Sequence, residues 1–353
     1  MNIFVGRNGA GKTNILEAIS YLCLTKSFYA TSDGTSLRIG ADAFTVDGRL
    51  HSDGDVTYAV GGSYEASSKT KRFTVNKAPV ERLSSMIGMF PLVVLSPENN
   101  AITFGTAGDR RRFMDLVLSQ ASRGYLEDLL EYRKILRQRN RLLLDGRMRR
   151  QERPEGLEAW SGPLVTRGAR IIQKRAAFAA EFHPYVVRAF EVLTGSEEKP
   201  DVVYESAAMA GGHGDAAALE ARLRELLAES AVEERRLGTT LVGPHRDELS
   251  LLINGLDLRR FASQGQHKTF LIGLKVAEFQ YLREGCKETP VLLLDDVLSE
   301  LDEERSRKLL ELTPELGQTF VTTTETSAAM TAFAGNDHRR FSVNEGSVEH
   351  ASD

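Results

Sequence analysis

The sequence predicts an α/β fold, in which a mixed β-sheet with flanking helices carries a separate helical lobe. A strand, a glycine-rich loop and a helix open the chain, and an apolar strand ends on two carboxylates near residue 295. Helical periodicity fills the middle, and 353 residues are enough for two domains. We expect residues 1–105 to form the first lobe, 106–235 the helical lobe, and 236–353 the return to the first fold.

Composition excludes several classes of protein. The apolar fraction of 41% and the charged fraction of 27% are those of a soluble globular protein, and no apolar run is long enough to cross a bilayer. No basic segment followed by an apolar one opens the chain, so we expect no secretory signal. Cys23 and Cys286 are too few for a disulfide framework and form no metal-binding pair, so we expect a cytoplasmic protein.

The strongest motif lies at the start of the chain. The apolar residues 1–5 predict a strand, residues 6–13 fit the pattern GxxxxGKS/T in full, and Ile15, Ile19 and Leu22 then recur at helical spacing. In such a P-loop, backbone N–H groups and the helix N-terminus bind phosphate oxygens. The alternative, a chance glycine turn, is disfavoured by the complete pattern in this context. The predicted nucleotide-binding residues are Gly6, Arg7, Asn8, Gly9, Ala10, Gly11, Lys12, Thr13 and Asn14.

Side chains at two distant positions are predicted to share the chemistry. Lys12 would reach the β and γ phosphates, and the Thr13 hydroxyl would hold Mg²⁺. The apolar residues 291–294 predict a strand buried on both faces, and Asp295 at its end is the second expected Mg²⁺ ligand. Asp296 is placed to orient or deprotonate the attacking water, and is the predicted catalytic residue. A strand-end turn with solvated carboxylates is the alternative for this pair.

A third segment has the features of an anion site. Ser263, Gln264, Gly265 and Gln266 precede apolar residues at helical spacing, and Ser263 stands at the predicted N-cap. A helix start with free N–H groups and a small hydroxyl suits a nucleotide presented by a second molecule. From this segment alone, an ordinary helix N-cap is the simpler interpretation.

The net charge of −4 conceals a basic region. Residues 110–175 hold 17 Lys and Arg against 8 Asp and Glu. Helical periodicity over 110–144 and 157–193, with a polar loop between, predicts a helical hairpin. A solvated or structural role is as good an explanation for any one arginine as contact with DNA phosphates. The candidate DNA-binding residues are Arg133, Lys134, Arg137, Arg139 and Arg141.

Two further segments can be placed from the sequence. Short alternating stretches between turns over 37–95 predict antiparallel strands beside the P-loop sheet. His245, next to Arg246 and Asp247, is expected to anchor the strand pair before the 263–266 segment; contact with DNA or nucleotide is the alternative.

Together these motifs resemble those of the ABC-type ATPases, and most closely those of the RecF family of bacterial DNA-repair ATPases. The block 243–247, and an Asp rather than a Glu at position 296, look like this family more than like transporters. The resemblance extends along most of the chain and is carried by residues 11–19, 25–28, 73–80, 95–98, 110–115, 132–140, 240–249, 263–266 and 295–302.

The resemblance implies an ABC-type ATPase head that forms an ATP-dependent homodimer. Each ATP, with Mg²⁺, would lie between the P-loop of one chain and residues 263–266, the signature segment, of the other, and Ser299 and Asp302 would belong to the D-loop. ATP hydrolysis would be slow and would act as a dimerisation switch. The resemblance also implies binding to double-stranded DNA and to junctions of single- and double-stranded DNA at the nucleoid. With RecR and RecO, the protein would assist RecA loading in recombinational repair, replication restart and the SOS response.

Two features depart from the family. The chain starts almost at the P-loop, so we expect the usual N-terminal strands to be missing from the sheet. No histidine follows the strand 320–324 at the switch position, and Thr324 or Glu325 could be the γ-phosphate sensor instead.

Other functions remain as alternatives. An ABC-type ATPase of another system, such as a transporter subunit, would share the three motifs, but it normally has fewer residues between Lys12 and Asp295 and needs no basic hairpin. An SMC-like structural ATPase needs a much longer coiled coil. A DNA clamp that uses ATP only as a dimerisation ligand differs from a slow ATPase in rate alone, so the sequence does not separate them.

Overall fold

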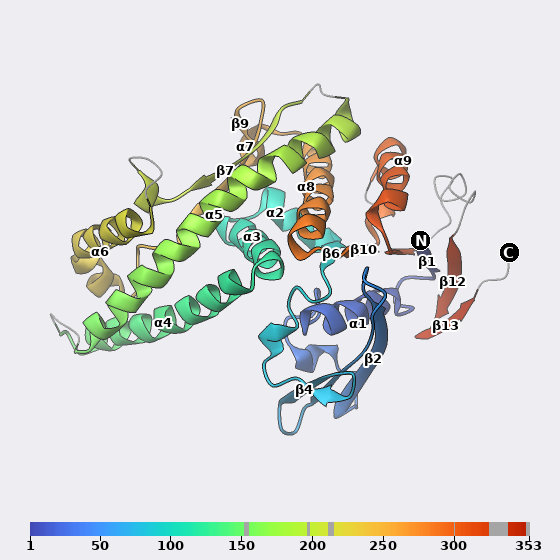
Figure 1. Cartoon of the computed structure of the whole chain (residues 1–353), viewed down its shortest axis with the longest axis horizontal. Coiled ribbons are helices and arrows are strands. Elements are labelled where there is room, and N and C mark those ends of the chain that lie inside the picture. Colours follow the sequence, from blue (N-terminus) through green and yellow to red (C-terminus); the bar gives the residue numbers. More distant parts are fainter. Residues whose placement is uncertain (152–154, 196–197, 211–214, 300, 325–337, 351–353) are drawn as a thin grey trace. The chain divides into compact units, whose positions relative to one another are not determined.

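The computed structural model describes residues 1–151, 155–195, 198–210, 215–299, 301–324 and 338–350 (Figure 1). The chain divides into two compact units. Unit 1 comprises residues 1–103, 185–199 and 262–353, and unit 2 comprises residues 104–184 and 200–261. In the described part of the chain, no helix combines the length and the apolar character needed to span a membrane.

Unit 1 contains two sheets. One has six strands in the order β13-β12-β1-β11-β10-β6, and all its pairings are parallel except that of β12 with β13. The other is antiparallel, in the order β2-β3-β4-β5. In chain order the elements of unit 1 are β1 (Asn2–Val5), α1 (Lys12–Leu24), β2 (Ala43–His51), β3 (Thr57–Glu65), β4 (Thr70–Val75), β5 (Ala78–Pro79), β6 (Leu92–Leu95), α8 (Gln264–Cys286), β10 (Val291–Asp295), α9 (Glu303–Leu312), β11 (Thr319–Thr323), β12 (Arg339–Asn344) and β13 (Ser347–His350).

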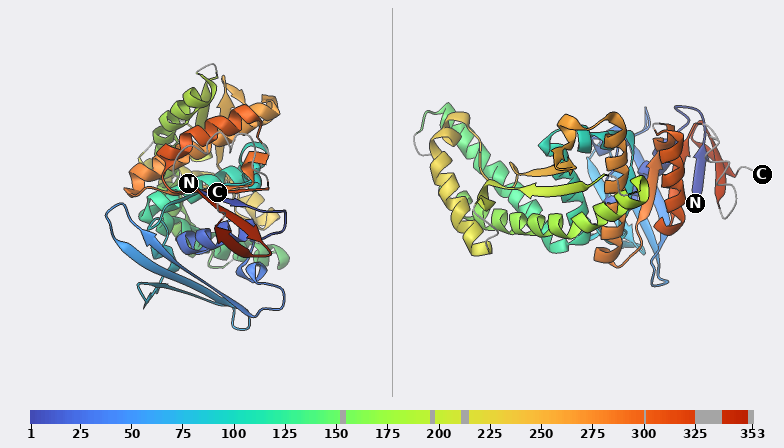
Figure 2. Two further views of the ribbon diagram at one scale, coloured as in Figure 1. Left: turned by 90° about the vertical axis from the view of Figure 1, so that its right-hand side faces the viewer. Right: turned by 90° about the horizontal axis from the view of Figure 1, so that it is seen from above.

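Helix α1 lies against both sheets, and Figure 1 shows it beside β2. The Tyr21 ring of α1 stacks on Phe73 and meets Phe44 edge-on, with centroids 5.2 and 5.1 Å apart. Gly48 of β2 leaves room for the helix, because an added Cβ there would lie 2.7 Å from the side chain of Leu22. The long β2–β3 hairpin is visible in Figure 2 and matches the antiparallel strands expected from the sequence.

The hairpin of β12 and β13 was not predicted from the sequence. β12 pairs with β1, and the backbone N–H of Gly346 in the hairpin turn donates to the Ala10 carbonyl at 2.8 Å. Gly6 permits this close approach, since an added Cβ would lie 2.4 Å from the Val343 carbonyl oxygen. The hairpin therefore packs directly against the glycine-rich loop.

Unit 2 combines long helices with a small antiparallel sheet in the order β7-β8-β9. The short helix α2 (Asn100–Phe104) ends where unit 2 begins, and α5 contributes its last residues to unit 1. The elements of unit 2 are α3 (Ala107–Ala121), α4 (Arg123–Met148), α5 (Leu157–Thr194), β7 (Pro200–Glu205), α6 (Ala216–Leu237), β8 (Glu248–Ile253), β9 (Leu256–Asp257) and α7 (Leu258–Phe261).

Helices α4 and α5 form the predicted helical hairpin, and α6 lies beside its closed end (Figures 1 and 2). Their antiparallel pairing is shown by two contacts: Asp128 accepts from Lys174 at 3.0 Å, and Arg139, later in α4, donates to Ser161, earlier in α5, at 3.2 Å. The first predicted helix is nevertheless two helices. Ser122 is extended (φ −142°), and its hydroxyl accepts from the backbone N–H of Tyr125 at 3.3 Å, so it ends α3 and caps α4.

The unit boundaries differ from the expected ones at two places. Residues 236–261 belong to unit 2 rather than to the first fold, because β8 pairs with β7 along its whole length. Residues 185–199 belong to unit 1, where Phe190 packs edge-on against Phe270 of α8 at 5.2 Å between centroids. The turn that joins β8 to β9 has Asn254 and Gly255 at φ 51° and 77°, the positive values that a type I′ hairpin turn requires.

Candidate functional site

The glycine-rich loop joins β1 to α1. Gly9 and Gly11 have φ of 79° and 100°, in the left-handed region where glycine is favoured, and Gly11 is the N-cap of α1. The Lys12 side chain is buried, and its Nζ donates to the carbonyl oxygens of Gly6 at 2.8 Å and Arg7 at 3.1 Å. The ammonium group thus lies over the loop itself. The side chains of Arg7, Asn8 and Asn14 are exposed.

The two predicted Mg²⁺ ligands are in contact. The Thr13 hydroxyl donates to Asp295, at 3.0 Å from Oδ1 and 3.1 Å from Oδ2, although the residues are far apart in the sequence. Asp295 ends β10, and Thr13 lies in the first turn of α1. Both side chains present oxygen atoms, the ligands that Mg²⁺ prefers, so they fit this metal.

Thr322, which we did not identify from the sequence, holds the carboxylate in place. It is fully buried in β11 directly opposite Asp295. Its hydroxyl donates to Asp295 Oδ1 at 2.7 Å and accepts from the backbone N–H of Asp296 at 2.9 Å. A polar residue inside the apolar strand 319–323 is the signal that could have revealed it, because a buried hydroxyl requires a partner.

Asp296 has two unusual features. Its φ of 50° lies in the left-handed region, which costs a non-glycine residue about 1 kcal/mol or more. Its Oδ1 atom is buried and has no hydrogen-bond partner among the described residues. Backbone strain and an unsatisfied carboxylate oxygen are typical of a functional position. The hydrogen bond from the Asp296 backbone N–H to the Thr322 hydroxyl holds the residue in this conformation.

Burial raises the pKa of the Asp295 carboxyl above its usual value. The hydrogen bonds from Thr322 and Thr13 lower that pKa, while the negative charges of Glu98 and Asp296 raise it further. Negative charge therefore accumulates at the C-terminal edge of β10 and the neighbouring β6, and a divalent cation would offset it.

The signature segment starts helix α8 as predicted. Ser263 is the N-cap, its hydroxyl accepts from the backbone N–H of Gln266 at 3.2 Å, and its own N–H donates to Gln266 Oε1 at 2.8 Å. The side chains of Ser263 and Gln264 are exposed. Among the described residues, no hydrogen bond or ion pair joins residues 263–266 to residues 6–14.

Of the two predicted D-loop residues, Asp302 is linked to helix α8 through Arg305. The Ser299 hydroxyl donates to the Asp296 carbonyl at 2.7 Å, and Asp302 is the N-cap of α9, accepting from the Arg305 N–H at 2.9 Å. Arg305 Nε donates to Thr269 Oγ1 at 2.8 Å, and that hydroxyl donates to the Gly265 carbonyl at 3.1 Å. Thr324 is half-buried at the end of β11, and Glu325 lies outside the described residues.

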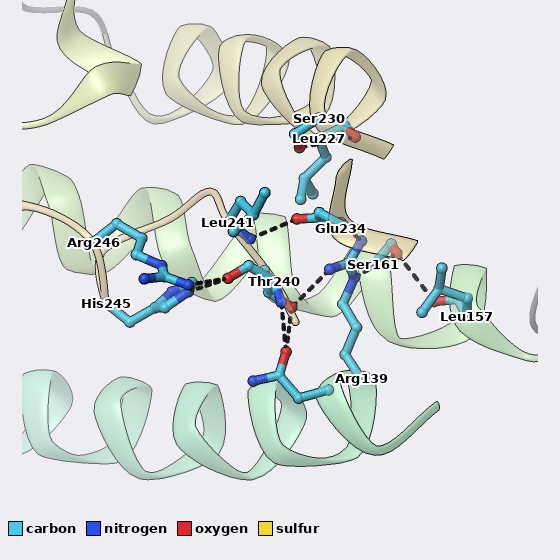
Figure 3. Close-up of polar contacts among 11 residues, drawn as sticks. Arg139, Leu157, Ser161, Leu227, Ser230, Glu234, Thr240, Leu241, His245 and Arg246 are labelled. Carbon is cyan, nitrogen blue, oxygen red and sulfur yellow. Dashed lines mark hydrogen bonds and ion pairs between the residues drawn. The ribbon is translucent and has the colours of Figure 1, made fainter. Parts of the chain in front are cut away.

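Arg139, a candidate for DNA contact, is in fact buried. Figure 3 shows its side chain extending from α4 toward α6 and the loop before β8. There Nη2 pairs with Glu234 Oε2 at 2.6 Å. Nη1 donates to Thr240 Oγ1 at 2.7 Å, and Nε donates to Ser161 Oγ at 3.2 Å. Its guanidinium has no surface for a phosphate, so the candidate set must be corrected: Arg139 has a structural role.

The other four candidates are exposed. Arg133 pairs with Asp115 at 2.9 Å, and Lys134 lies 3.9 Å from Glu131. Arg137 and Arg141 are exposed residues of α4, and their side chains form no hydrogen bond or ion pair with the rest of the described chain.

His245 joins the loop before β8 to α4. Its Nε2 lies 3.1 Å from the Thr240 carbonyl, which can only accept, so Nε2 carries the proton (Figure 3). The Tyr132 hydroxyl then donates to Nδ1 at 2.6 Å. Burial, together with the positive charges of Arg246, Arg111 and Arg139, lowers the pKa of His245 to about 4, so the ring is neutral at pH 7. It therefore anchors this loop rather than the strand pair as we expected.

Comparison with known proteins relates the chain to one family. An AAA domain family matches residues 1–140. The DNA replication and repair protein RecF of Chloroherpeton thalassium is 42% identical over 92% of this chain and 89% of its own length. The RecF protein of Salinibacter ruber is 40% identical over 92% of this chain and 79% of its own length.

Solved structures lead to the same family. The recombination mediator protein RecF of the RecFOR pathway, in its RecF-ATPrS structure, is 30% identical over 99% of this chain and 92% of that one, with a TM-score of 0.88. The Smc head domain of Pyrococcus furiosus, at 12% identity and a TM-score of 0.53, shares the fold alone. The family predicted from the motifs is confirmed: the chain belongs to the RecF family of DNA replication and repair proteins.

Proposed function

We propose that this chain is an ATPase of DNA replication and repair that binds ATP together with Mg²⁺. The contact of Thr13 with both oxygens of Asp295 is the observation that carries the proposal. This contact places the N-terminus of α1, which would bind the phosphates, beside the Asp295 carboxylate, which would complete the metal site. RecF relatives whose structures are described with ATP support the choice of nucleotide.

The chain's own residues would divide the work. The loop N–H groups and the start of α1 bind phosphate oxygens, and Lys12 gives up its carbonyl contacts to bind the β and γ phosphates. Thr13 and Asp295 hold Mg²⁺, which offsets charge on the phosphates. Asp296 accepts the proton of the attacking water, and Thr322 orients both aspartates.

We propose further that ATP joins two copies head to tail. The exposed Ser263 and the N-terminal N–H groups of α8 would face the γ-phosphate held by the partner. A small, exposed, capped helix start suits such a contact. Slow hydrolysis would then act as the switch that ends the dimer.

The DNA part of the proposal is supported by the family and by the exposed basic side chains of α4. Arg133, Lys134, Arg137 and Arg141 would contact DNA phosphates independently of sequence. We propose that the dimer binds double-stranded DNA and junctions with single-stranded DNA at the nucleoid. RecR and RecO would be its partners in assisting RecA loading, in line with the RecFOR pathway named for the structural relative.

Mixing two defective variants tests the composite site. Ser263→Arg leaves the P-loop intact but blocks the dimer interface at residues 263–266. Lys12→Ala impairs the P-loop but leaves residues 263–266 intact. In a head-to-tail heterodimer both lesions fall on one site, and the other site is intact. We expect neither variant alone to hydrolyse ATP, and the mixture to recover part of the activity.

Ser32→Arg is the matched control, because Ser32 is also an exposed serine that caps a short helical segment with a capping box. It should retain ATP-dependent dimers in sedimentation. Normal dimers of Ser263→Arg would exclude the composite site. Single-turnover hydrolysis with and without duplex DNA separates a slow ATPase from a clamp that only binds ATP, because the clamp would release no phosphate.

A further inference from the structure

We propose that a cavity in unit 2, apart from the nucleotide site, is an anion site that takes a phosphate group. The cavity has a volume of about 240 Å³ and is lined by α3, α4, α5 and the loop before β8. At about 30 Å³ per water molecule, this is room for one tetrahedral anion with several waters. The charged groups and the histidine in its wall are Arg111, Arg112, Asp115, Arg133, Arg175 and His245.

The wall has an excess of positive charge. Among the residues that line the cavity there are four guanidinium groups, which stay charged at any physiological pH, and one carboxylate, that of Asp115; Asp109, outside the lining, lies 3.6 Å from Arg112. His245 adds no charge, since its pKa is lowered to about 4, first by burial. A concave surface with unbalanced charge of one sign concentrates ions of the opposite sign.

The back of the cavity is rigid. Arg175 is 3% exposed, and its guanidinium donates to Asp115 Oδ1 at 2.7 Å, to the Tyr125 hydroxyl at 2.9 Å and to the Pro244 carbonyl at 2.6 Å. Tyr132 holds His245 at the same wall. Because these groups are fixed before any ligand arrives, binding would require little ordering of this part of the site.

The front of the cavity has free donors. Arg111 makes one hydrogen bond among the described residues, from Nη1 to the Asp247 carbonyl at 2.5 Å. The Arg112 side chain is 78% exposed and makes no hydrogen bond within the described chain, since its Nη1 atom lies 3.6 Å from Asp109 Oδ1. Arg133, 50% exposed, uses a single nitrogen on Asp115. A guanidinium has five N–H donors in a fork that fits phosphate oxygens, so all three can bind an anion without losing these contacts.

Two further observations favour an anion here. Burial lowers the pKa of Arg111, and the charge of Arg175 lowers it further against the opposing effect of Glu248, Asp247 and Asp115. Gly108, in the first turn of the 15-residue helix α3, also lines the cavity, so the partial positive charge of that helix end adds to the field.

The ligand chemistry is a phosphate oxyanion, which a DNA backbone or free phosphate could supply. The first arm of the test uses inorganic phosphate and the Lys12→Ala chain, so that phosphate binding at the P-loop is weakened and the result does not depend on the proposed ATPase. Thermal unfolding is compared in phosphate and in chloride at equal ionic strength. We expect phosphate to raise the midpoint, and Arg112→Gln with Arg133→Gln to lose most of that rise.

Arg123→Gln is the matched control, because Arg123 is also an arginine of α4, is 74% exposed, is not a DNA candidate and does not line the cavity. It should keep the full rise. Arg112→Gln alone, at a highly exposed position, provides a second variant that should fold normally and lose part of the rise. No difference between phosphate and chloride, or an equal loss with Arg123→Gln, would overturn the anion site.

The second arm measures duplex DNA binding by fluorescence anisotropy over a range of salt concentrations. If DNA supplies the phosphate, the double glutamine variant should lower the log–log salt slope by about 0.9 for each lost contact, and Arg123→Gln should not. If only the response to inorganic phosphate changes, the cavity binds a free phosphate. A loss of DNA affinity in Arg123→Gln as large as that in the double variant would exclude DNA as the source of the phosphate.

Discussion

The nucleotide site of unit 1 and the basic helices of unit 2 differ in how far their sequence motifs specify geometry. In unit 1, Thr13 and Asp295 come into contact from opposite ends of the chain. In unit 2, residues chosen by charge take different roles: Arg139 is buried in an ion pair, and Arg137 is exposed. A P-loop pattern specifies backbone conformation and the neighbouring strand, whereas a count of arginines specifies neither their face nor their partner.

Asp296→Asn should give the largest effect and tests the unit 1 side of this comparison. Asparagine keeps the size of the side chain but cannot accept the proton of water, so we expect hydrolysis to fall by about 10²–10⁴-fold while ATP binding is kept. Single-turnover phosphate release measures the rate, and nucleotide titration measures binding.

Asp295→Asn is the control, because it should weaken Mg²⁺ binding and with it ATP binding. If both variants bind ATP and Mg²⁺ normally and lose hydrolysis equally, the two aspartates do not have separate roles.

Arg139→Met tests the unit 2 side of the comparison. Removing one partner leaves the Glu234 carboxylate, 1% exposed, without its counter-charge, and breaking such a buried pair costs about 3–5 kcal/mol of the free energy of unfolding. Arg137→Met, two residues earlier and exposed, should change it by less than about 0.5 kcal/mol. Urea unfolding measures both. Equal stabilities would mean that the ion pair is not a stabilising element of this hairpin.

The position of Arg139 could have been predicted from helical spacing. Ile135, Arg139 and Leu143 follow one another at intervals of four and are all buried, so the arginine lies within the apolar stripe of α4. Arg137 and Arg141 lie on the opposite, exposed face. Charge alone concealed this pattern.

Other features were outside the reach of the sequence. The fold and the P-loop follow from local patterns, and the family was identified correctly. The break at Ser122 was missed because apolar periodicity continues across a single extended residue. The contact of Gly346 with the glycine-rich loop, and that of Thr322 with Asp295, join segments that are distant in the chain, and no local pattern encodes such pairings.

Lys12→Ala should weaken ATP binding about a hundredfold, because the phosphates lose a charged hydrogen-bond donor. Such a hydrogen bond contributes up to about 3 kcal/mol to the binding free energy. DNA affinity without nucleotide should be unchanged, since no described DNA candidate lies in unit 1. Equilibrium binding of a fluorescent ATP analogue and of duplex DNA measures the two effects. Loss of DNA affinity without nucleotide would break the comparison, because one substitution would then affect both functions.

Thr322→Val gives the smallest effect and examines how the unit 1 site is positioned. Valine has nearly the same shape but removes the donor to Asp295 and the acceptor of the Asp296 N–H. Loss of about 1–1.5 kcal/mol of hydrogen bonding should shift the Mg²⁺ concentration needed for ATP binding by about tenfold, and should also slow hydrolysis. Thr322→Ser restores the hydroxyl and should recover both properties. If Thr322 had a purely structural role, Thr322→Val and Thr322→Ser would lower the thermal midpoint, and the Mg²⁺ dependence of ATP binding would stay unchanged. An unchanged Mg²⁺ titration in Thr322→Val, measured below its unfolding temperature, would therefore show that the aspartates are positioned without Thr322.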